Sequence, residues 1–214
     1  LERLPTILKK IKSIKSVLIT NYPGKKSLKQ NKIKGIKIFY YNKVKYKKEK
    51  VFSFKKFDFD KELAILYSSG TTGKPKQIVH SAKNIYYWAV FSLSTLGLYA
   101  DDKHCALHSM TMSHIADNAF VWSLTFIGGR HAFMTCSMGD VGGFLQTLSD
   151  ESVTIAKAAP TLISIACGFS AKAFAKYDLS EIRWIWSAGA ALADDLRTRA
   201  EERFGCDIWR GYGA

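Results

Sequence analysis

Short apolar runs alternate with longer amphipathic runs over most of the chain, from about residue 82 to residue 210. The short runs favour β-strands at 104–108, 130–134, 154–158, 182–186 and 207–210. The longer runs favour helices at 82–98, 116–126, 141–148, 162–176 and 193–204. Strands that are joined by whole helices pair in parallel. The sequence therefore predicts an α/β fold of layered, parallel-rich sheets with crossover helices.

Upstream of this alternation, two short apolar runs, 63–67 and 77–80, flank a polar loop rich in glycine, serine and threonine. A further strand-like run, 17–20, follows apolar residues at helical spacing near the N-terminus. In layered α/β folds, ligands bind at the carboxyl ends of strands. We therefore expect the loops that follow strands, this polar loop included, to carry the functional site.

Positive charge is concentrated at one end of the chain, whose 214 residues have a net charge of +14. Residues 1–61 hold 18 lysines and one arginine against four acidic residues, whereas residues 62–214 are close to neutral. We expect 1–61 to form a lysine-rich N-terminal part of a large domain and 62–214 to form its core. Arginine forks are usual at nucleic-acid sites, so this lysine-only pattern favours a solvated surface. A basic module that binds a polyanion or an acidic lipid surface is the alternative.

Several other classes of protein are disfavoured by composition. Hydrophobic residues make up 47% of the chain, which is enough for a sizeable core. We expect no membrane span, because no run of bilayer length is sufficiently apolar, and a cytoplasmic location. The cysteines are widely spaced, without a CxxC pair, which argues against a disulfide scaffold or a zinc module. No metal-ligating set is expected from the spaced histidines 104, 108 and 114.

The polar loop at 67–76, YSSGTTGKPK, carries the strongest chemical signal. Gly70 and Gly73 permit tight turns and a close approach of backbone N–H groups to an anion. Hydroxyl and ammonium donors surround these glycines, at Ser68, Ser69, Thr71, Thr72, Lys74 and Lys76. The spacing differs from that of a Walker A loop, because no GK[ST] follows. The loop is therefore typical of a polyphosphate site of another kind.

These residues resemble the phosphate loop of the adenylate-forming superfamily, which contains acyl-CoA synthetases, luciferases and peptide-synthetase adenylation domains. Four segments downstream also resemble motifs of this family, in the family's order: 112–116 (MSHIA), 153–161 (VT through APT), 182–192 (IRWIWSAGAAL) and 207–214 (DIWRGYGA). Together the resemblance covers about residues 55–214. It implies that the chain is a partial N-terminal domain of an adenylate-forming enzyme, with the family's C-terminal domain absent.

The resemblance also implies a reaction. In this family a carboxylate attacks the α-phosphate of ATP, which gives an acyl-adenylate and pyrophosphate, and the thiol of coenzyme A then displaces AMP. The implied cofactors are ATP, Mg²⁺ and coenzyme A, and the implied partner is a small-molecule carboxylate, not a nucleic acid. Residues 55–80 are most similar to acetoacetyl-CoA synthetases, and residues 104–214 to general fatty-acyl or aryl-CoA ligases. The acid is therefore expected to be acetoacetate or a fatty or aryl acid.

Site residues follow from the matched motifs. Thr71 and Lys76 are expected to act in catalysis, with Lys76 near the leaving pyrophosphate. The nucleotide is expected to contact the phosphate loop and two further loops, through Ser68, Ser69, Gly70, Thr72, Gly73, Lys74, Gly189, Ala190, Ala191, Gly211, Tyr212 and Gly213. The acyl pocket is expected to include His114, Ser187 and Ala188. No metal ligand is expected among the residues of this chain.

The chain also departs from the family pattern. It stops at Ala214, where the family continues with Thr and with a Glu that holds Mg²⁺. The family's ribose-binding Asp and its adenylation lysine are also absent. The chain is therefore interpreted as a fragment that binds nucleotide weakly and turns over poorly by itself. A non-catalytic ligase remnant, or a chimera joined near residue 104, where lysine gives way to arginine, is the alternative.

Overall fold

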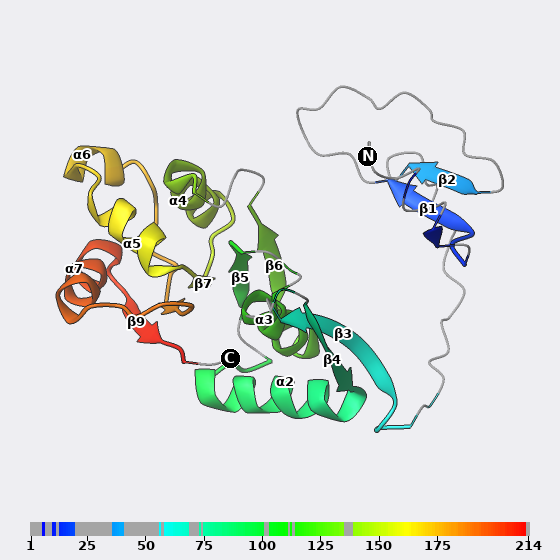
Figure 1. The fold of residues 1–214 in the computed structure, drawn as a ribbon. Helices are drawn as coiled ribbons and strands as arrows, with labels where there is room; N and C mark the ends of the chain where they lie inside the picture. The colour runs from blue at the N-terminus through cyan, green and yellow to red at the C-terminus, as the bar shows by residue number, and fades with distance from the viewer. Residues whose placement is uncertain are drawn as a thin grey trace. The chain divides into compact units, whose positions relative to one another are not determined.

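A computed structural model describes residues 6, 10–11, 13–19, 36–40, 56, 58–68, 73, 75–100, 103–110, 112, 114–134 and 139–212. The chain divides into two compact units, Leu1–Lys55 and Lys56–Ala214 (Figure 1). In the smaller unit, β1 (Ser16–Ile19) pairs in parallel with β2 (Lys37–Tyr40). This pairing confirms the strand predicted at 17–20. The functional division predicted at residue 61 stays a prediction.

The larger unit is built on a five-stranded sheet. Its strands are β5 (Cys105–His108), β6 (Arg130–Phe133), β7 (Ile155–Lys157), β8 (Trp184–Ser187) and β9 (Asp207–Arg210). Their order across the sheet is β6-β5-β7-β8-β9, and every neighbouring pair is parallel. The structure therefore confirms the α/β class and the parallel sheet predicted from the alternation of strands and helices.

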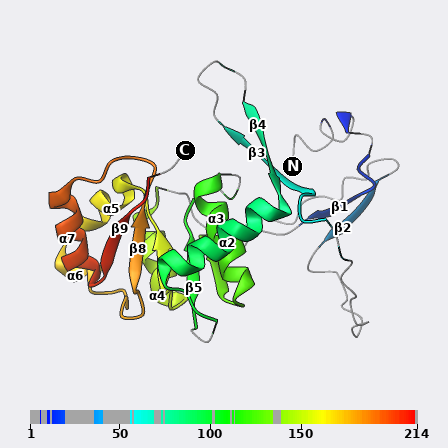
Figure 2. The ribbon, with the colours of Figure 1, turned by 90° about the horizontal axis from the view of Figure 1, so that it is seen from below.

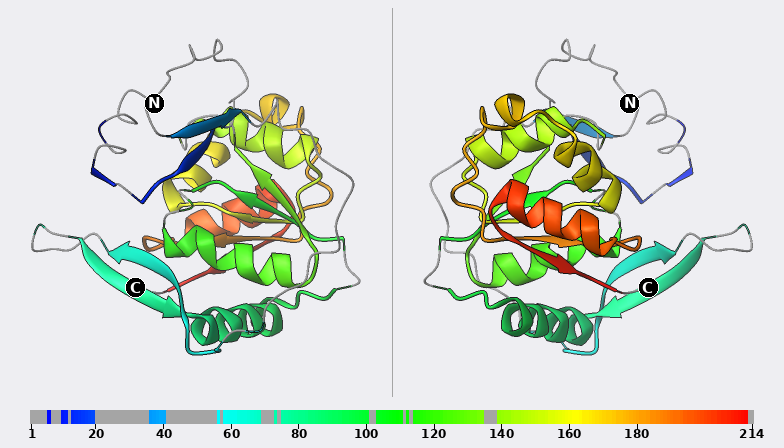
Figure 3. Two further views of the ribbon diagram at one scale, coloured as in Figure 1. Left: turned by 90° about the vertical axis from the view of Figure 1, so that its right-hand side faces the viewer. Right: turned by 90° about the vertical axis from the view of Figure 1, so that its left-hand side faces the viewer.

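Helices cover both faces of this sheet (Figure 3). On one face, α4 (Val141–Asp150), α5 (Pro160–Cys167) and α7 (Asp194–Phe204) enclose the main core, with Leu145 and Ile163 fully buried. On the other face, α2 (Ala82–Leu96) and α3 (Ile115–Phe126) enclose a second core around Phe120. Each large side chain that is fully buried in this way contributes roughly 1.5–3 kcal/mol.

Local sequence explains where the helices begin and end. At the start of α2, Ser81 and Asn84 form a reciprocal capping box, and Gly97 ends this helix in a left-handed conformation. The single helix predicted over 162–176 is wrong. The chain instead forms α5 and a separate short α6 (Ala171–Phe174). Gly168 ends α5, and Ser170 starts α6 by accepting a hydrogen bond from the backbone N–H of Ala173.

A separate two-stranded sheet precedes this core. β3 (Glu62–Ser68) and β4 (Lys76–Ser81) pair in antiparallel, and neither strand belongs to the five-stranded sheet (Figure 2). The glycine- and hydroxyl-rich loop therefore lies at the tip of a hairpin. The loop follows a strand, β3, as expected, but this strand does not belong to the parallel sheet. A connection this short favours a hairpin, because a parallel return needs a crossover of a dozen or more residues.

No helix in the described part of the chain combines the length and the apolar character that are needed to cross a bilayer.

Candidate active site

The hairpin tip carries two described ends of the predicted phosphate loop. Ser68 is the last residue of β3, and Lys76 is the first residue of β4, with its side chain exposed. Gly73 has φ +96°, a conformation that glycine adopts without strain, and no atom lies within 4 Å of the position that a Cβ would take. The predicted contacts Ser69, Gly70, Thr71, Thr72 and Lys74 lie outside the described residues.

The loop that follows β8 carries two residues predicted for the acyl pocket, Ser187 and Ala188, and three predicted for the nucleotide site, Gly189, Ala190 and Ala191. Ser187, the last residue of β8, is buried, and Ala188 is half-buried. Gly189 turns the chain with φ +91°. Ala190 and Ala191 are exposed beyond it. At the end of β8, Ser187 and Ala188 are therefore wholly or partly shielded from solvent, and the next three residues, 189–191, are exposed.

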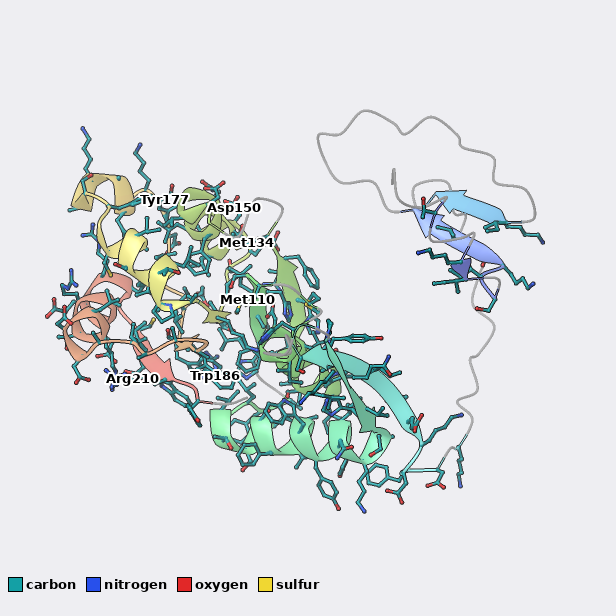
Figure 4. All side chains as sticks on the ribbon, viewed as in Figure 1. Met110, Met134, Asp150, Tyr177, Trp186 and Arg210 are labelled. Carbon is teal, nitrogen blue, oxygen red and sulfur yellow. The ribbon has the colours of Figure 1, made fainter. Side chains whose placement is uncertain are left out.

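The loop that follows β9 lies directly beside the β8 loop. The backbone N–H of Gly211 donates to the carbonyl of Ser187 at 2.8 Å. A Cβ at Gly211 would overlap the indole of Trp186, which is labelled in Figure 4, so only glycine fits here. Tyr212 is fully exposed, and Gly213 lies outside the described residues. The structure thus brings two of the predicted nucleotide loops together at the carboxyl ends of β8 and β9.

His114, the predicted acyl-pocket residue, lies just before α3 and is exposed. Its carbonyl accepts hydrogen bonds from the backbone N–H groups of Asp117 and Asn118, at 3.2 and 3.1 Å. These two bonds form the first turn of α3. His114 is therefore held at the start of the helix that covers the second core.

A chain of polar side chains, which was not predicted from the sequence, runs from the buried pair His108 and Asp117 to half-buried His131 and exposed Thr125. His108 Nδ1 lies 3.1 Å from Asp117 Oδ1, and His108 Nε2 lies 2.9 Å from His131 Nδ1. His131 Nε2 in turn lies 3.1 Å from the hydroxyl of Thr125. Asp117 Oδ2 accepts from the backbone N–H of Met110 at 3.1 Å. Desolvation, and then the neighbouring His108, lower the pKa of His131.

Lys157, the last residue of β7, is buried on the α3 side of the sheet and is only 4% exposed. Its Nζ has no hydrogen-bond partner among the described residues. The ammonium lies 3.9 Å from the centroid of the Phe120 ring and 5.3 Å from that of Trp186. Desolvation lowers the pKa of Lys157 to about 7, although the charge of Asp117 opposes this shift.

Both buried features were visible in the sequence only as weak signals. Asp117 is an acidic residue in the first turn of a predicted helix, a position that is usual for solvated carboxylates. Lys157 interrupts the otherwise apolar run TIAKAAP. Neither signal indicates which partner the side chain meets, since the partners come from other strands, loops and helices.

The strand order provides a reason to place a ligand site near these residues. Within the sheet, β6 lies next to β5 on one edge of that strand, and β7, which follows β6 in the sequence, lies next to β5 on its other edge. The connection after β5 leads to α3 and the connection after β7 leads to α5, and these helices lie on opposite faces. The carboxyl ends of β5 and β7 therefore flank a topological switch point, where open α/β sheets bind their ligands.

Cysteine chemistry is not favoured here. Burial raises the pKa of the thiols of Cys105 and Cys167, so both stay protonated near neutral pH. Cys105 is fully buried within the main core, as expected from its apolar run, and Cys167 is half-buried at its edge. Within the described part of the chain, no three histidine, cysteine or acidic side chains are grouped so that they could hold a metal ion.

Known proteins match this chain in sequence and in fold. A probable CoA ligase, CCL5, of Humulus lupulus is 27% identical over 150 residues, which are 70% of this chain and 27% of that protein. The anthranilate CoA ligase AuaEII, solved in complex with anthranoyl-AMP, is 27% identical with a TM-score of 0.64, and the match covers 73% of this chain and 30% of that one. The N-terminal domain of FACL13 from Mycobacterium tuberculosis, at 21% identity and a TM-score of 0.63, shares the fold over 83% of this chain and 44% of its own.

The chain thus spans less than a third of the length of the curated relative from Humulus lupulus. A family model described as "AMP-binding enzyme" matches residues 4–214, which is nearly the whole chain. The chain belongs to the AMP-binding enzyme family.

Proposed function

We propose that this chain forms part of an ATP-dependent acid–thiol ligase, which activates a carboxylate as an acyl-adenylate and transfers the acyl group to coenzyme A. The observation that carries the proposal is the family match over residues 4–214. The adjoining loops at Ser187 and Gly211 support it, because they lie at the carboxyl edge of the sheet. The acid proposed from the sequence is acetoacetate or a fatty or aryl acid.

The proposed chemistry has two steps. A carboxylate oxygen attacks the α-phosphorus of ATP, and the bond to the bridging oxygen breaks, which releases pyrophosphate. The thiol sulfur then attacks the acyl carbonyl, loses its proton and expels AMP. The protein's part in the first step is to align the reactants and to neutralise charge on the leaving group. Lys76 and the hydroxyl of Thr71 are the residues that we propose for that second task.

The nucleotide is proposed to lie along the carboxyl edge of the sheet. Gly189, Ala190 and Ala191 present an exposed turn against which an adenine could pack. The fully exposed ring of Tyr212 is available to stack on it. Mg²⁺, when bound, would neutralise the phosphate oxygens, and we expect it to be held mainly by the ATP phosphates.

Nucleotide binding is the direct test. Calorimetric titration of the chain with ATP and Mg²⁺ should give a measurable affinity, and Lys76→Ala should weaken it by about tenfold because one charge-assisted contact is lost. Lys172→Ala, a matched change at an exposed lysine in α6, should leave the affinity unchanged. Equal affinities for the protein with and without Lys76 would contradict its role in phosphate binding.

The acid is tested separately. A panel of acetoacetate, fatty acids, aryl acids and dicarboxylic acids is used in an ATP–pyrophosphate exchange assay, with the chain and with any longer protein that contains it. Exchange that depends on one class of acid would identify the substrate. Exchange with none of the acids, from a longer protein that contains this chain and binds ATP, would contradict the ligase activity while leaving nucleotide binding intact.

A further inference from the structure

The amine of Lys157 is the one buried cation in the described part of the chain that neither the core nor the proposed adenylation chemistry uses. Its side chain lies on the α3 side of the sheet, at the last residue of β7. Burying an ammonium without a hydrogen-bonding partner costs free energy, so a buried amine of this kind calls for an explanation such as a bound ligand. The position, at the switch point between β5 and β7, is where a ligand is expected.

The acidic side chain whose charge acts on Lys157, that of Asp117, binds other groups and makes no hydrogen bond to it. Both carboxylate oxygens of Asp117 are engaged, one with His108 and the other with the backbone N–H of Met110. No hydrogen bond or ion pair joins Lys157 to Asp117, although the two charges attract through space. The three N–H donors of Lys157 therefore remain without an acceptor among the described residues.

The Lys157 amine lies against two aromatic rings that pack on each other, with their centroids 5.2 Å apart, and one of these rings reaches solvent. Phe120 is 1% exposed, whereas the indole of Trp186 is half-buried. Trp186 also touches Gly211, the residue that begins the proposed nucleotide loop after β9. A ligand group that approaches from the nucleotide side would therefore reach Lys157 past the edge of Trp186.

We infer that Lys157 selects acids that carry a second carboxylate, distant from the one that is activated. The second carboxylate would accept hydrogen bonds from Nζ and supply the missing counter-charge, while the carbon chain between the two acid groups would pack against the paired rings of Phe120 and Trp186. A chain that ends in a methyl group would leave the ammonium without an acceptor, which penalises the monoacid. This inference rests on the proposed function, because it assigns the far end of the same acid site.

Matched pairs of free acids test the inference without any turnover. Glutarate, adipate and pimelate are titrated calorimetrically into the chain beside pentanoate, hexanoate and heptanoate. At least one diacid should bind tenfold or more tightly than the monoacid of the same length. Lys157→Met should abolish that preference, and Lys172→Met, at an exposed lysine, should keep it. Equal binding of diacids and monoacids, no binding of any diacid, or a preference that survives Lys157→Met would overturn the inference.

A second measurement uses the unmodified protein and covers the case in which Lys157→Met does not fold. With ¹³C-labelled lysine, the Cε signal that titrates near pH 7 reports Lys157, because burial gives it a pKa far below that of exposed lysines. Adipate should move this signal and raise the pH at which it titrates, and hexanoate should not. No response to any of the three diacids would overturn the inference.

The two proposals fail in different ways. If the chain binds ATP but shows no diacid preference, only the role of Lys157 is wrong. If the chain shows a diacid preference that depends on Lys157 but binds no nucleotide, the acid site stands and the ligase function is wrong.

Discussion

The two candidate ligand regions of this protein are built in opposite ways. The hairpin tip between β3 and β4 presents Lys76 and Gly73 to solvent. The two strands that hold this tip are consecutive in the sequence and pair with each other in the structure. The switch point between β5 and β7 instead buries His108, Asp117 and Lys157, which come from three different elements. Local sequence is therefore sufficient to recognise the first region, whereas the second exists only after the sheet has formed.

The difference has an energetic consequence. Exposed polar groups at the hairpin tip are hydrated in the free protein and would contact the ligand in the complex. Their removal should therefore lower the ligand affinity and leave the free energy of unfolding unchanged. Buried polar groups at the switch point are already desolvated, so their loss should affect folding as well. Four substitutions, in order of decreasing effect on stability, test this contrast.

Asp117→Ala should have the largest effect. It leaves the N–H of Met110 and the ring of His108 without their acceptor in a fully buried site, which should lower the free energy of unfolding by about 3 kcal/mol. Urea denaturation followed by circular dichroism measures the change. Asp195→Ala removes an exposed carboxylate that pairs with Arg199 on α7 and should cost less than about 1 kcal/mol. Similar losses in the two variants would contradict the contrast.

Lys157→Met should act in the opposite direction, raising the free energy of unfolding by about 1–3 kcal/mol at pH 7 because a buried amine without a partner is removed. The pKa of Lys157 is about 7 when folded and 10.5 ordinarily. Between these values the unfolded chain holds a proton that the folded chain has lost, so stability rises with pH through this window. Urea denaturation at several values of pH should show this rise in the parent protein and a smaller one in Lys157→Met. A methionine variant that is less stable at pH 7 would show that the aromatic contacts outweigh the desolvation.

Gly211→Ala should cost about 1–3 kcal/mol, because the added Cβ overlaps the indole of Trp186 and forces this ring to move. The same substitution made together with Trp186→Phe should cost less, since the smaller ring leaves room. A double-mutant cycle on the free energy of unfolding measures this coupling. Additive effects would show that the close approach of Gly211 to Trp186 carries no energetic weight.

Lys76→Ala should have the smallest effect on folding, within about 0.5 kcal/mol, because its side chain is exposed at the start of β4. Its predicted effect is on ATP affinity alone. A thermal melt without ligand should therefore coincide with that of the parent protein, and the extra stabilisation on adding ATP and Mg²⁺ should be reduced. A loss of stability without ligand would place Lys76 in the structure of the hairpin instead of at the phosphate site.

Sequence reasoning predicted the class of the fold and most of its elements, since hydrophobic periodicity is a local property of the chain. It failed at residues 168–170, where the cap at Ser170 was not read and one helix was predicted instead of α5 and α6. It did not indicate that the apolar runs around the polar loop form a separate antiparallel sheet, because their pairing partners cannot be identified from the runs themselves. The motif residues at 187–191 and 211–212 were predicted through resemblance, and the structure brings them side by side.

By itself, then, the sequence determined the alternation of strands and helices, the glycine- and hydroxyl-rich loop, and the residues of the family motifs. Each of these features consists of residues that are close together along the chain. Only the tertiary structure decided the strand order, with its switch point between β5 and β7. It also decided that Asp117 meets His108 and that the amine of Lys157 lies against the paired rings of Phe120 and Trp186. The physical reason is that a buried polar group is defined by partners that long-range strand pairing and helix packing bring to it.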